Sequence, residues 1–512
     1  MLSRISSCAV EGIHGSMVDV EVDIRFGLPA FVTVGLPDAA VKESRERVRA
    51  AIKNSGYTFP DDRITVNLAP ADVKKDGTAF DLPTAMAILT ASGALPQDRV
   101  APFLFFGELS LDGRLKPVKG SLPMAMAARK AGFQSIVVPH ENRRETSVVQ
   151  GLDVYPAKTL SQVVGFVLGN VDLVPETTDV HTLFRDGGRH DTDFSEIMGQ
   201  EHVKRALEIS AAGGHNMLMT GPPGSGKTML ARSFPSILPP LSFEEAIETT
   251  AIFSVAGILE KDQALVTRRP FRAPHHTISD AGLIGGGHHP RPGEVSLAHN
   301  GVLFLDELPE FRKHVLEVLR QPLEDRNVTI SRAASSLTFP SSFSLIAAMN
   351  PCPCGYMTDT THACTCSPAQ IDRYRSRLSG PLLDRIDLHI DVPAVPFREI
   401  RKGRASETSA DVRSRVSAAR DIQSKRFMKA AIHANAQMTN RMIHRHCALD
   451  AESLSLLEQA INRLGLSARA YNRVIKISRT IADLAGEPDI RAVHVSEAIQ
   501  YRSLDRGGRM AR

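Results

Sequence analysis

The stretch Gly221–Thr228 constrains the fold of this chain more than any other part of its 512 residues. It fits the pattern G-x-x-x-x-G-K-[ST] without a mismatch. The apolar run 216–220 precedes it and residues 229–232 suit the start of a helix, so the sequence predicts a buried parallel strand, a tight loop and a helix. An ordinary Gly/Pro turn is the alternative, but four fixed positions arise by chance in only roughly one chain in fifty of this length.

Such a loop binds phosphate because its backbone N–H groups and the N-terminus of the following helix point at the anion. Lys227 is expected to neutralise the β- and γ-phosphates, and Thr228 to bind Mg²⁺. The motif therefore predicts ATP and Mg²⁺ as cofactors. The predicted nucleotide-binding residues of the loop are Gly221, Pro222, Pro223, Gly224, Ser225, Gly226, Lys227 and Thr228.

A second motif, Gly301–Glu307, is an apolar strand pattern with two carboxylates at its C-terminal end. Ligand sites of open α/β sheets lie at this end of the strands. Alone, a strand that ends in Asp-Glu is more often a solvated strand end than a site. Downstream of a complete phosphate loop it predicts an ATPase, in which Asp306 holds Mg²⁺ and Glu307 orients and polarises the attacking water.

The composition is that of a soluble globular protein of about three domains, with 42% hydrophobic and 23% charged residues. The sequence shows no signal peptide pattern and no apolar run near the roughly 20 residues that cross a bilayer, so we expect a cytoplasmic protein outside the membrane. Six cysteines in a chain of this length do not indicate a disulfide framework. The isolated Cys8 and Cys447 are expected to be small buried residues.

Basic residues concentrate toward the C-terminus. Residues 401–512 contain 21 Lys and Arg against 11 Asp and Glu, which leaves 40 against 46 in residues 1–400. This asymmetry favours an acidic partner such as DNA, although basic helices are as often only solvated surface.

Residues 1–168 are expected to form an α/β or α+β domain, because short apolar runs alternate with helical patterns such as 38–54. Three stretches, 70–80, 107–114 and 137–144, resemble the proteolytic domain of Lon proteases, which implies the same fold. The apolar runs that predict strands are 17–24, 30–34, 64–68, 103–106 and 135–138.

The resemblance to Lon fails at the residues that carry the chemistry. Ala79 stands where the family has its nucleophilic serine, and Leu122 stands where it has its lysine base. An alanine has no oxygen to attack with, and a leucine cannot take a proton. Thr78 and Lys119 are neighbouring substitutes, but a dyad needs hydrogen-bond reach and not only proximity in sequence. The domain is therefore expected to be catalytically inactive.

Residues 169–192 have little periodicity and are expected to be a linker, followed by an ATPase core with a parallel sheet at 193–397 and a basic helical lid at 398–512. The segment Phe194–Glu201 resembles the part of magnesium-chelatase-type AAA+ proteins that lies over the adenine. Almost eighty residues separate the two nucleotide motifs, more than one crossover needs, so a helix-2 insert of the kind found in that clade is expected.

Two stretches of the insert, 269–279 and 285–294, are dense in His, Gly and Arg. Neighbouring histidines such as His275 and His276 do not face one metal site. A loop that faces the pore of a ring and touches phosphates is therefore favoured over a metal site.

Downstream of the insert, residues 328–339 are expected to form a β-hairpin and residues 345–350 a buried strand. The strand ends in Asn350. By resemblance to the same clade, Asn350 is the sensor that holds the lytic water.

Four cysteines form two C-x-C pairs in the loop 352–366, separated by nine residues. Four soft ligands close together suit tetrahedral Zn²⁺. His362 is an alternative to one thiolate, and a set of reduced cysteines in an exposed loop is the alternative to any metal. The predicted zinc ligands are Cys352, Cys354, Cys364 and Cys366.

Gly380–Asp387 resembles the segment that carries the arginine finger in this clade, so Arg385 is expected to act on the ATP of the next subunit. An ion pair of Arg385 with Asp384 or Asp387 is the alternative. Arg469 and its neighbours resemble the sensor-2 segment of the lid, which acts on the γ-phosphate of its own subunit. A surface arginine on a basic helix is the alternative there.

With these motifs in this order behind a Lon-like domain, the full length of the chain resembles the ComM/YifB family of magnesium-chelatase-like AAA+ ATPases. The resemblance implies a homo-hexameric ring that acts on DNA as a helicase. It further implies branch migration of recombination intermediates during natural transformation, together with recombination proteins. The motifs by themselves predict a ring ATPase that acts on an acidic polymer.

Three other functions stay open. A magnesium chelatase ATPase subunit would share the core and the lid but has no need of the Lon-like domain or the cysteine pairs. A Lon-class peptidase would share the N-terminal fold, but Ala79 and Leu122 speak against it. A nucleotide-gated DNA-binding scaffold that does not translocate would carry the same motifs, and DNA-stimulated turnover with strand displacement would separate it from a motor.

Overall fold

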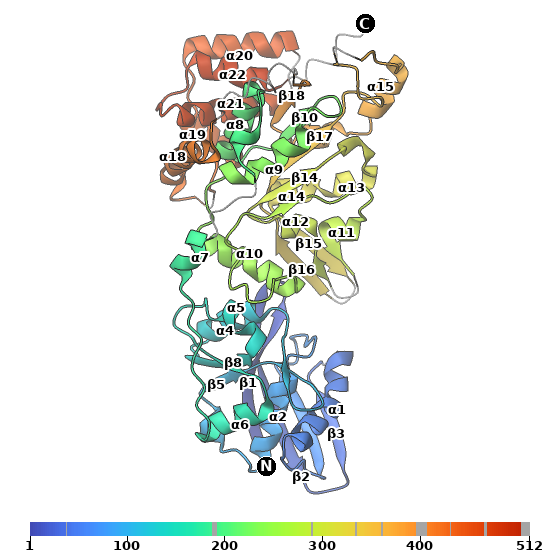
Figure 1. Ribbon diagram of the computed structural model, residues 1–512, viewed down its shortest axis with the longest axis vertical. Helices are drawn as coiled ribbons and strands as arrows, with labels where there is room; N and C mark the ends of the chain where they lie inside the picture. Colours follow the sequence, from blue (N-terminus) through green and yellow to red (C-terminus); the bar gives the residue numbers. More distant parts are fainter. Residues whose placement is uncertain are drawn as a thin grey trace. The chain divides into compact units, whose positions relative to one another are not determined.

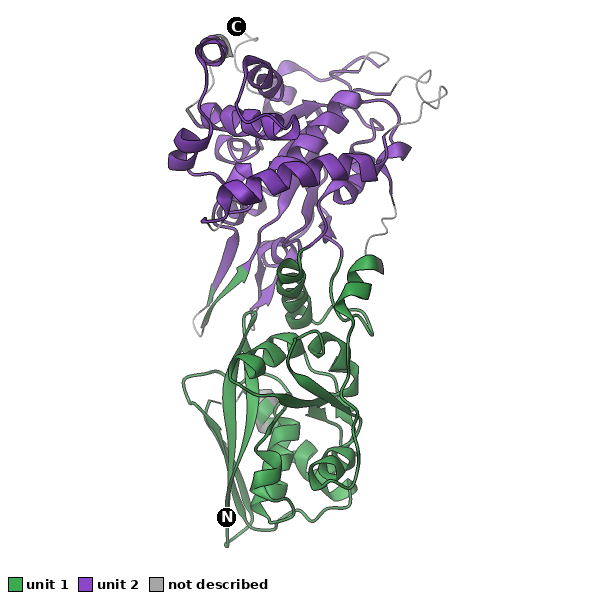
Figure 2. Cartoon of the chain, turned by 90° about the vertical axis from the view of Figure 1, so that its left-hand side faces the viewer, with its two compact units in different colours: residues 1–187, 242–267, 331–339 green, residues 188–241, 268–330, 340–512 purple. Residues whose placement is uncertain are grey.

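Figure 1 shows the computed structural model of the chain. Two compact units are distinguished in Figure 2. Unit 1 comprises Met1–Gly187, Ser242–Thr267 and Ser331–Phe339, and unit 2 comprises Gly188–Leu241, Arg268–Ile330 and Pro340–Arg512. The structure describes residues 1–36, 38–186, 192–287, 290–332, 335–359, 362–395, 407–430, 432–464 and 468–502.

A seven-stranded sheet in the order β3-β4-β2-β1-β5-β8-β9 forms the centre of unit 1 (Figure 1). Strand β2 pairs antiparallel with β1 and β4, and the other neighbours pair parallel. All five apolar runs predicted from the sequence are strands of this sheet. The bounds are β1 Leu2–Glu11, β2 His14–Arg25, β3 Ala30–Val34, β4 Arg63–Ala69, β5 Phe103–Phe105, β8 Ser135–Pro139 and β9 Asp153–Ala157, with a small ribbon of β6 Glu108–Leu109 and β7 Leu115–Lys116.

Helices α2 and α4 pack on this sheet, and α2 is buried at every position. Asp81 at the start of α2 is buried as well, and the Arg47 guanidinium neutralises it with contacts of 2.8 and 3.1 Å. The α/β architecture expected for the N-terminal domain is confirmed. The helices are α1 Ala39–Asn54, α2 Asp81–Ala91, α3 Gln97–Val100, α4 Ser121–Lys130, α5 Arg143–Thr146, α6 Leu160–Leu168, α7 Val180–Asp186 and α10 Phe243–Ala256, with the 3₁₀ turn η1 at His140–Asn142.

Helix α7 lies within the stretch that the sequence predicts to be a linker. Val180, Leu183 and Phe184 follow a helical spacing and pack against a buried cluster that includes Leu122. Three apolar positions in so short a stretch do not stand out as a periodic pattern, so the sequence gives no sign of this helix.

Part of the predicted insert belongs to unit 1. Helix α10 begins with a capping box of Ser242 and Glu245, and its Ala251 joins the apolar cluster around Leu122. Ala79 is also buried, at 5% exposure, in a separate apolar cluster. Thr78 donates a hydrogen bond to the Glu108 carboxylate. The two positions at which Lon carries its dyad are therefore apolar packing positions here.

A five-stranded parallel sheet in the order β11-β14-β17-β10-β18 forms the centre of unit 2. The strands are β10 Met217–Thr220, β11 Phe271–Arg272, β14 Val302–Leu305, β17 Ser344–Met349 and β18 Leu388–Asp391. Strands β10, β14 and β17 are apolar and almost entirely buried, as the sequence predicts for parallel strands. The parallel-sheet core is confirmed.

Helices of unit 2 pack on the sheet and continue into a helical C-terminal part that shares one hydrophobic core with it. No helix in the described ranges is both long and apolar enough to span a bilayer. Cys8 and Cys447 are buried, as expected. The helices are α8 Glu201–Gly213, α9 Lys227–Ile237, α11 Asp280–Ile284, α12 Glu294–Leu297, α13 Lys313–Val318, α14 Arg320–Asp325, α15 Pro368–Arg375, α16 Gly380–Leu383, α18 Ser409–Phe427, α19 Asn440–His446, α20 Ala451–Leu464, α21 Ala468–Leu484 and α22 Ala492–Gln500.

Short elements complete the chain. The expected β-hairpin is formed by β15 (Asn327–Arg332) and β16 (Ser335–Pro340), and β12 (Gly285–Gly286) pairs with β13 (Arg291–Pro292). Three 3₁₀ turns are η2 Phe194–Glu196, η3 Leu308–Glu310 and η4 Asn435–Gln437.

Candidate nucleotide-binding site

Three neighbouring strands of the parallel sheet bring the sequence motifs to one edge. Strand β10 leads into the loop Gly221–Gly226, β14 ends directly before Asp306, and β17, which lies between them, ends directly before Asn350. Because the strands are parallel, their carboxyl ends meet at the same edge of the sheet. The topology therefore assembles motifs that are far apart in sequence.

Lys227 lies at the first position of α9 and is buried. Its Nζ donates to the backbone oxygens of Gly221 at 2.7 Å and Pro222 at 2.9 Å, and to Asn350 Oδ1 at 3.3 Å. Burial lowers the pKa of the Lys227 ammonium, and the negative charges of Asp306 and Glu307 oppose this shift. The ammonium is held inside the loop that is expected to receive the phosphates.

A contact between Thr228 and Asp306 joins the phosphate loop to the motif Gly301–Glu307. The Thr228 hydroxyl donates to Asp306 Oδ2 at 2.9 Å. A hydroxyl and a carboxylate oxygen at this separation are hard ligands that suit Mg²⁺, which keeps several waters and binds few protein groups. The donor set fits the predicted ion.

Glu307 projects from the same edge with a left-handed backbone, at φ 51°, and its side chain is 56% exposed. The His276 ring lies beside it, with 3.5 Å between His276 Nδ1 and Glu307 Oε2. This neighbour was not expected from the sequence, where His276 was only part of a His-rich stretch. In the described residues the only group of side chains with metal-site geometry is the cysteine cluster, and His288 and His289 of that stretch lie outside them.

The segment expected to lie over the adenine contacts the phosphate loop. Gln200 Nε2 donates to the backbone oxygens of Ser225 and Pro393, both at 2.9 Å. Phe194 is buried in the core of unit 2. The segment is thus anchored on one side by an aromatic ring and on the other by the loop itself.

Arg385 is nearly buried and does not reach the phosphate loop of its own chain. Its guanidinium contacts the Glu324 carboxylate of α14 and the backbone oxygen of Pro381. Asp384 instead pairs with Arg469 at 3.3 Å, and Asp387 pairs with Arg473 and shares a hydrogen bond of 3.0 Å with His215. The alternative considered from the sequence, an ion pair of Arg385 with Asp384 or Asp387, is therefore wrong, because Arg385 pairs with Glu324.

Arg469 is the second residue of α21, and its side chain is 65% exposed. Within the described residues, the polar contacts of Arg385 and Arg469 are thus with Glu324, Pro381 and Asp384 and not with the residues around Lys227. Both arginines are held by acidic residues, Glu324 and Asp384, of the same chain.

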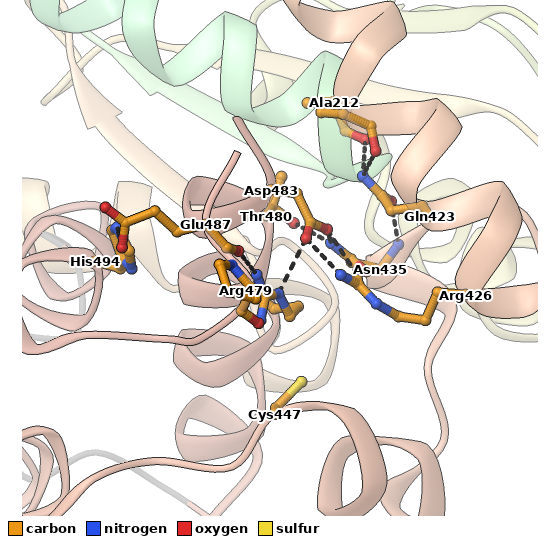
Figure 3. A network of polar contacts seen from close by, with 12 residues as sticks. Ala212, Gln423, Arg426, Asn435, Cys447, Arg479, Thr480, Asp483, Glu487 and His494 are labelled. Atoms are coloured by element: carbon orange, nitrogen blue, oxygen red, sulfur yellow. Dashed lines mark hydrogen bonds and ion pairs between the residues drawn. The ribbon is translucent and has the colours of Figure 1, made fainter. Parts of the chain in front are cut away.

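A buried polar network fixes α21 against the rest of unit 2 (Figure 3). Asp483 of α21 accepts hydrogen bonds from Arg426 of α18 at 2.7 Å and from Asn435 at 2.8 Å. Gln423, one turn before Arg426, donates to the backbone oxygen of Ala212 in α8 at 3.0 Å. The helix that carries Arg469 is therefore tied to α8, which packs beside the sheet.

The four loop cysteines lie together. Their sulfur atoms fall within 4.8 Å of one another, with Cys352 to Cys354 at 3.3 Å, Cys352 to Cys364 at 3.7 Å and Cys354 to Cys364 at 3.6 Å. A tetrahedron with Zn–S bonds of about 2.3 Å has edges of about 3.8 Å. These separations fit a zinc site and are far longer than the about 2.05 Å of a disulfide.

The His362 ring lies beside the Tyr356 ring, with centroids 4.9 Å apart and planes tilted by 35°, and His362 Nδ1 lies 3.6 Å from Asp359 Oδ1. The histidine therefore has partners outside the cysteine cluster. The four candidate metal ligands of this group are all cysteines.

Comparison with known sequences identifies the family. Residues 20–142, 193–400 and 406–502 match, in that order, the families described as subunit ChlI of Mg-chelatase; magnesium chelatase, subunit ChlI; and magnesium chelatase, subunit ChlI C-terminal. The chain is 46% identical to the competence protein ComM of Haemophilus influenzae over 508 residues, which cover 99% of this chain and 98% of that protein. The chain belongs to the ComM/YifB family of magnesium-chelatase-like AAA+ proteins.

Another member of the ComM/YifB family, YifB of Escherichia coli, is 44% identical over 507 residues, or 99% of this chain and 98% of that protein. Lon protease 2 of Bacillus subtilis is 25% identical over 184 residues, or 32% of this chain and 33% of that protein. The resemblance to Lon and the resemblance to the ComM/YifB family, both read from the sequence, are confirmed. The family assignment makes the parallel sheet of unit 2 an AAA+ ATPase core.

Proposed function

We propose that this ComM/YifB-family ATPase is a ring-forming motor that moves on DNA and drives branch migration when transforming DNA is integrated. One observation supports the motor above all: Lys227, Thr228, Asp306, Glu307 and Asn350 meet at one sheet edge, within reach of one bound nucleotide. The role on DNA is supported by the similarity to a protein named for competence.

In the proposed cycle, Lys227 exchanges its loop carbonyl partners for the β- and γ-phosphates, which offer a charge-assisted contact. Mg²⁺ held by Thr228 and Asp306 supplies charge neutralisation on the phosphates. Asn350 holds the attacking water, and Glu307 accepts its proton. Asn350 already contacts Lys227, so the water would be positioned next to the γ-phosphate.

Completion of the site requires a second chain. Arg385 and Arg469 stabilise the negative charge on the transferring phosphoryl group, Arg385 from the neighbouring subunit and Arg469 from its own. Among the described residues the Arg385 guanidinium bonds to Glu324 and Pro381, so its proposed function needs an interface that draws it toward a neighbour's ATP. This dependence is the reason to propose a homo-hexameric ring.

Contact with DNA is proposed for the basic C-terminal part and for the His- and Arg-rich stretches of the insert. Lysine and arginine bind the phosphate backbone without reading sequence. Such contacts therefore suit a ring that surrounds DNA of any sequence. A nucleotide-gated scaffold would bind DNA in the same way but would not separate strands.

A peptidase is not supported by unit 1. Ala79 and Leu122 are packed in apolar clusters, and Thr78 is bonded to Glu108. We propose that unit 1 serves assembly or partner binding instead.

The test of the proposed function is the rate of ATP hydrolysis with no DNA and with single-stranded, duplex and four-way-junction DNA. We expect DNA to stimulate turnover several-fold and junction DNA to be resolved into separated duplexes only when ATP is hydrolysed. Lys227→Ala is the matched control, because it removes the phosphate contact. DNA binding without stimulated turnover or strand movement would support the scaffold, and turnover indifferent to every DNA would contradict both.

We also propose a structural zinc ion bound by Cys352, Cys354, Cys364 and Cys366. Metal analysis of the purified protein is expected to find about one equivalent per chain, because four thiolates at these separations close a tetrahedral site. Cys354→Ser is expected to lose the metal. Cys447→Ser is the control, since Cys447 lies far from the cluster in sequence and is buried among apolar residues. Metal-free protein with full activity would refute the zinc site.

A further inference from the structure

Gly355 of the cysteine loop lies against the nucleotide site. Its backbone lies so close to Pro223 of the phosphate loop that an added Cβ atom would stand 2.6 Å from Pro223 Cδ and 2.8 Å from Pro223 Cγ. The same position is 3.9 Å from Cγ of Asn350. Gly355 therefore packs against both the phosphate loop and the proposed sensor of the lytic water.

The backbone at Gly355 is left-handed, with φ at 86°, which glycine adopts without strain. Two features make glycine necessary here: the sign of φ and the closeness of Pro223. Any larger residue has to push on the Pro223 ring or move the loop that carries it.

The proposed zinc ligands hold Gly355 in this place. Cys354 directly precedes Gly355, and the N–H of Gly355 donates to the backbone oxygen of Cys352 at 3.0 Å. The N–H of Cys354 in turn points at the Cys366 sulfur at 3.3 Å. The first pair of cysteines thus holds the residue directly before Gly355 and the carbonyl that Gly355 bonds to, and Cys366 of the second pair ties this turn to a later part of the loop.

The described parts of the loop between Asn350 and Pro368 contain turns but no helix or strand. A segment of this kind has little to fix its shape except the contacts of its cysteines, and ordering it costs backbone conformational entropy. A metal that binds only the folded arrangement supplies that ordering.

We propose that the cysteine loop is a zinc-dependent wall of the ATP site, in which Gly355 is a positioning residue that holds Pro223 and Asn350 in the phosphate-binding arrangement. The inference rests on the zinc site proposed above and not on any action on DNA. It gives the metal a function: release of zinc frees the wall and weakens the binding of ATP.

The test is the affinity for a fluorescent ATP analogue, measured without DNA in a Glu307→Gln background so that the analogue is not hydrolysed. Gly355→Ala is expected to raise Kd about tenfold or more while zinc content stays at that of the parent. Gly486→Ala is the matched control: Gly486 also has a positive φ, at 70°, but an added Cβ there meets nothing within 4 Å. Its Kd should match that of the parent.

A second measurement, zinc removal from the parent protein, tests the same proposal without changing the contact between Gly355 and Pro223. Removal of zinc by a strong chelator is expected to raise Kd in the parent to the level of Gly355→Ala, and addition of zinc should restore it. Restored zinc should not rescue Gly355→Ala, because the clash with Pro223 persists. A general loss of folding would instead lower the thermal unfolding temperature of both glycine variants.

The outcomes separate the two proposals. Two results would contradict the proposed role of the cysteine loop in ATP binding without affecting the zinc site. One is a Kd that does not change when zinc is removed, and the other is a Gly355→Ala variant that binds the analogue as tightly as Gly486→Ala. If purified protein holds no zinc, the zinc site and its control of ATP binding both fall. Neither result bears on DNA-stimulated turnover, which is measured independently.

Discussion

Replacing Glu307 by glutamine is expected to reduce ATP hydrolysis about 10²- to 10⁴-fold while ATP still binds, which is the range for loss of a general base. Glutamine has almost the same size and keeps a hydrogen-bonding oxygen, but it cannot accept the proton of the attacking water. Lys227, Thr228 and Asp306 are unchanged, and the contact of Thr228 with Asp306 at 2.9 Å does not involve Glu307. The variant should therefore accumulate with ATP bound and should trap assembled rings.

The measurement is turnover beside the affinity for ATP, with ring formation followed by size. Glu310→Gln is the matched control, because Glu310 is a neighbouring exposed carboxylate that pairs with Arg377 at 2.8 Å. It is expected to leave turnover within about twofold of the parent, as an exposed ion pair contributes little. Equal losses in both variants, or loss of ATP binding in Glu307→Gln, would remove Glu307 from the proposed role.

The strands that carry the nucleotide motifs were predictable because each is a short apolar run that ends in the residues of a motif. Parallel strands buried on both faces need no alternation of polar and apolar residues, so β10, β14 and β17 are visible as continuous runs. Their order in the sheet is then a consequence of the family fold. The meeting of Lys227, Asp306 and Asn350 follows from that order.

Two strands of unit 1 were not predictable in the same way. In β1 the buried positions include Ser3 and Ser7, so the apolar pattern of the strand is interrupted by polar residues. In β9 Pro156 argues against a strand, and it is tolerated because β9 lies at the edge of the sheet. Burial and edge position are properties of the folded sheet, which local patterns do not contain.

The contacts within the site show the same limit. Cysteine spacing predicts which residues gather in the cysteine cluster, since all four are close in sequence. By contrast, His276 lies beside Glu307 and Gly355 lies beside Pro223. His276 and Gly355 lie in loops whose paths depend on the packing of the whole core. Residue type alone gave no reason to choose them.

Arg385→Ala is expected to lower turnover by about three orders of magnitude or more while ATP still binds, as loss of an arginine finger does. The fold should tolerate the change, because the partner that loses its ion pair, Glu324, is 56% exposed and can be solvated. Glu324→Gln is the matched control. If Arg385 acts only through its pair with Glu324, the two variants should be equally impaired; if it acts on a neighbour's ATP, Glu324→Gln should keep most of the activity.

Mixing Arg385→Ala with Lys227→Ala chains tests the neighbour directly. In a mixed ring, some interfaces join a chain with intact Lys227 to a chain with intact Arg385, so part of the activity is expected to return although each variant alone is inactive. A site completed within one chain gives no such rescue, because neither variant holds both residues. If mixed rings form and stay inactive, Arg385 does not act between chains. The contact of Arg385 with Glu324 would then be its whole role, and ATP hydrolysis in one subunit would lack the link to the next that a ring motor needs to move DNA.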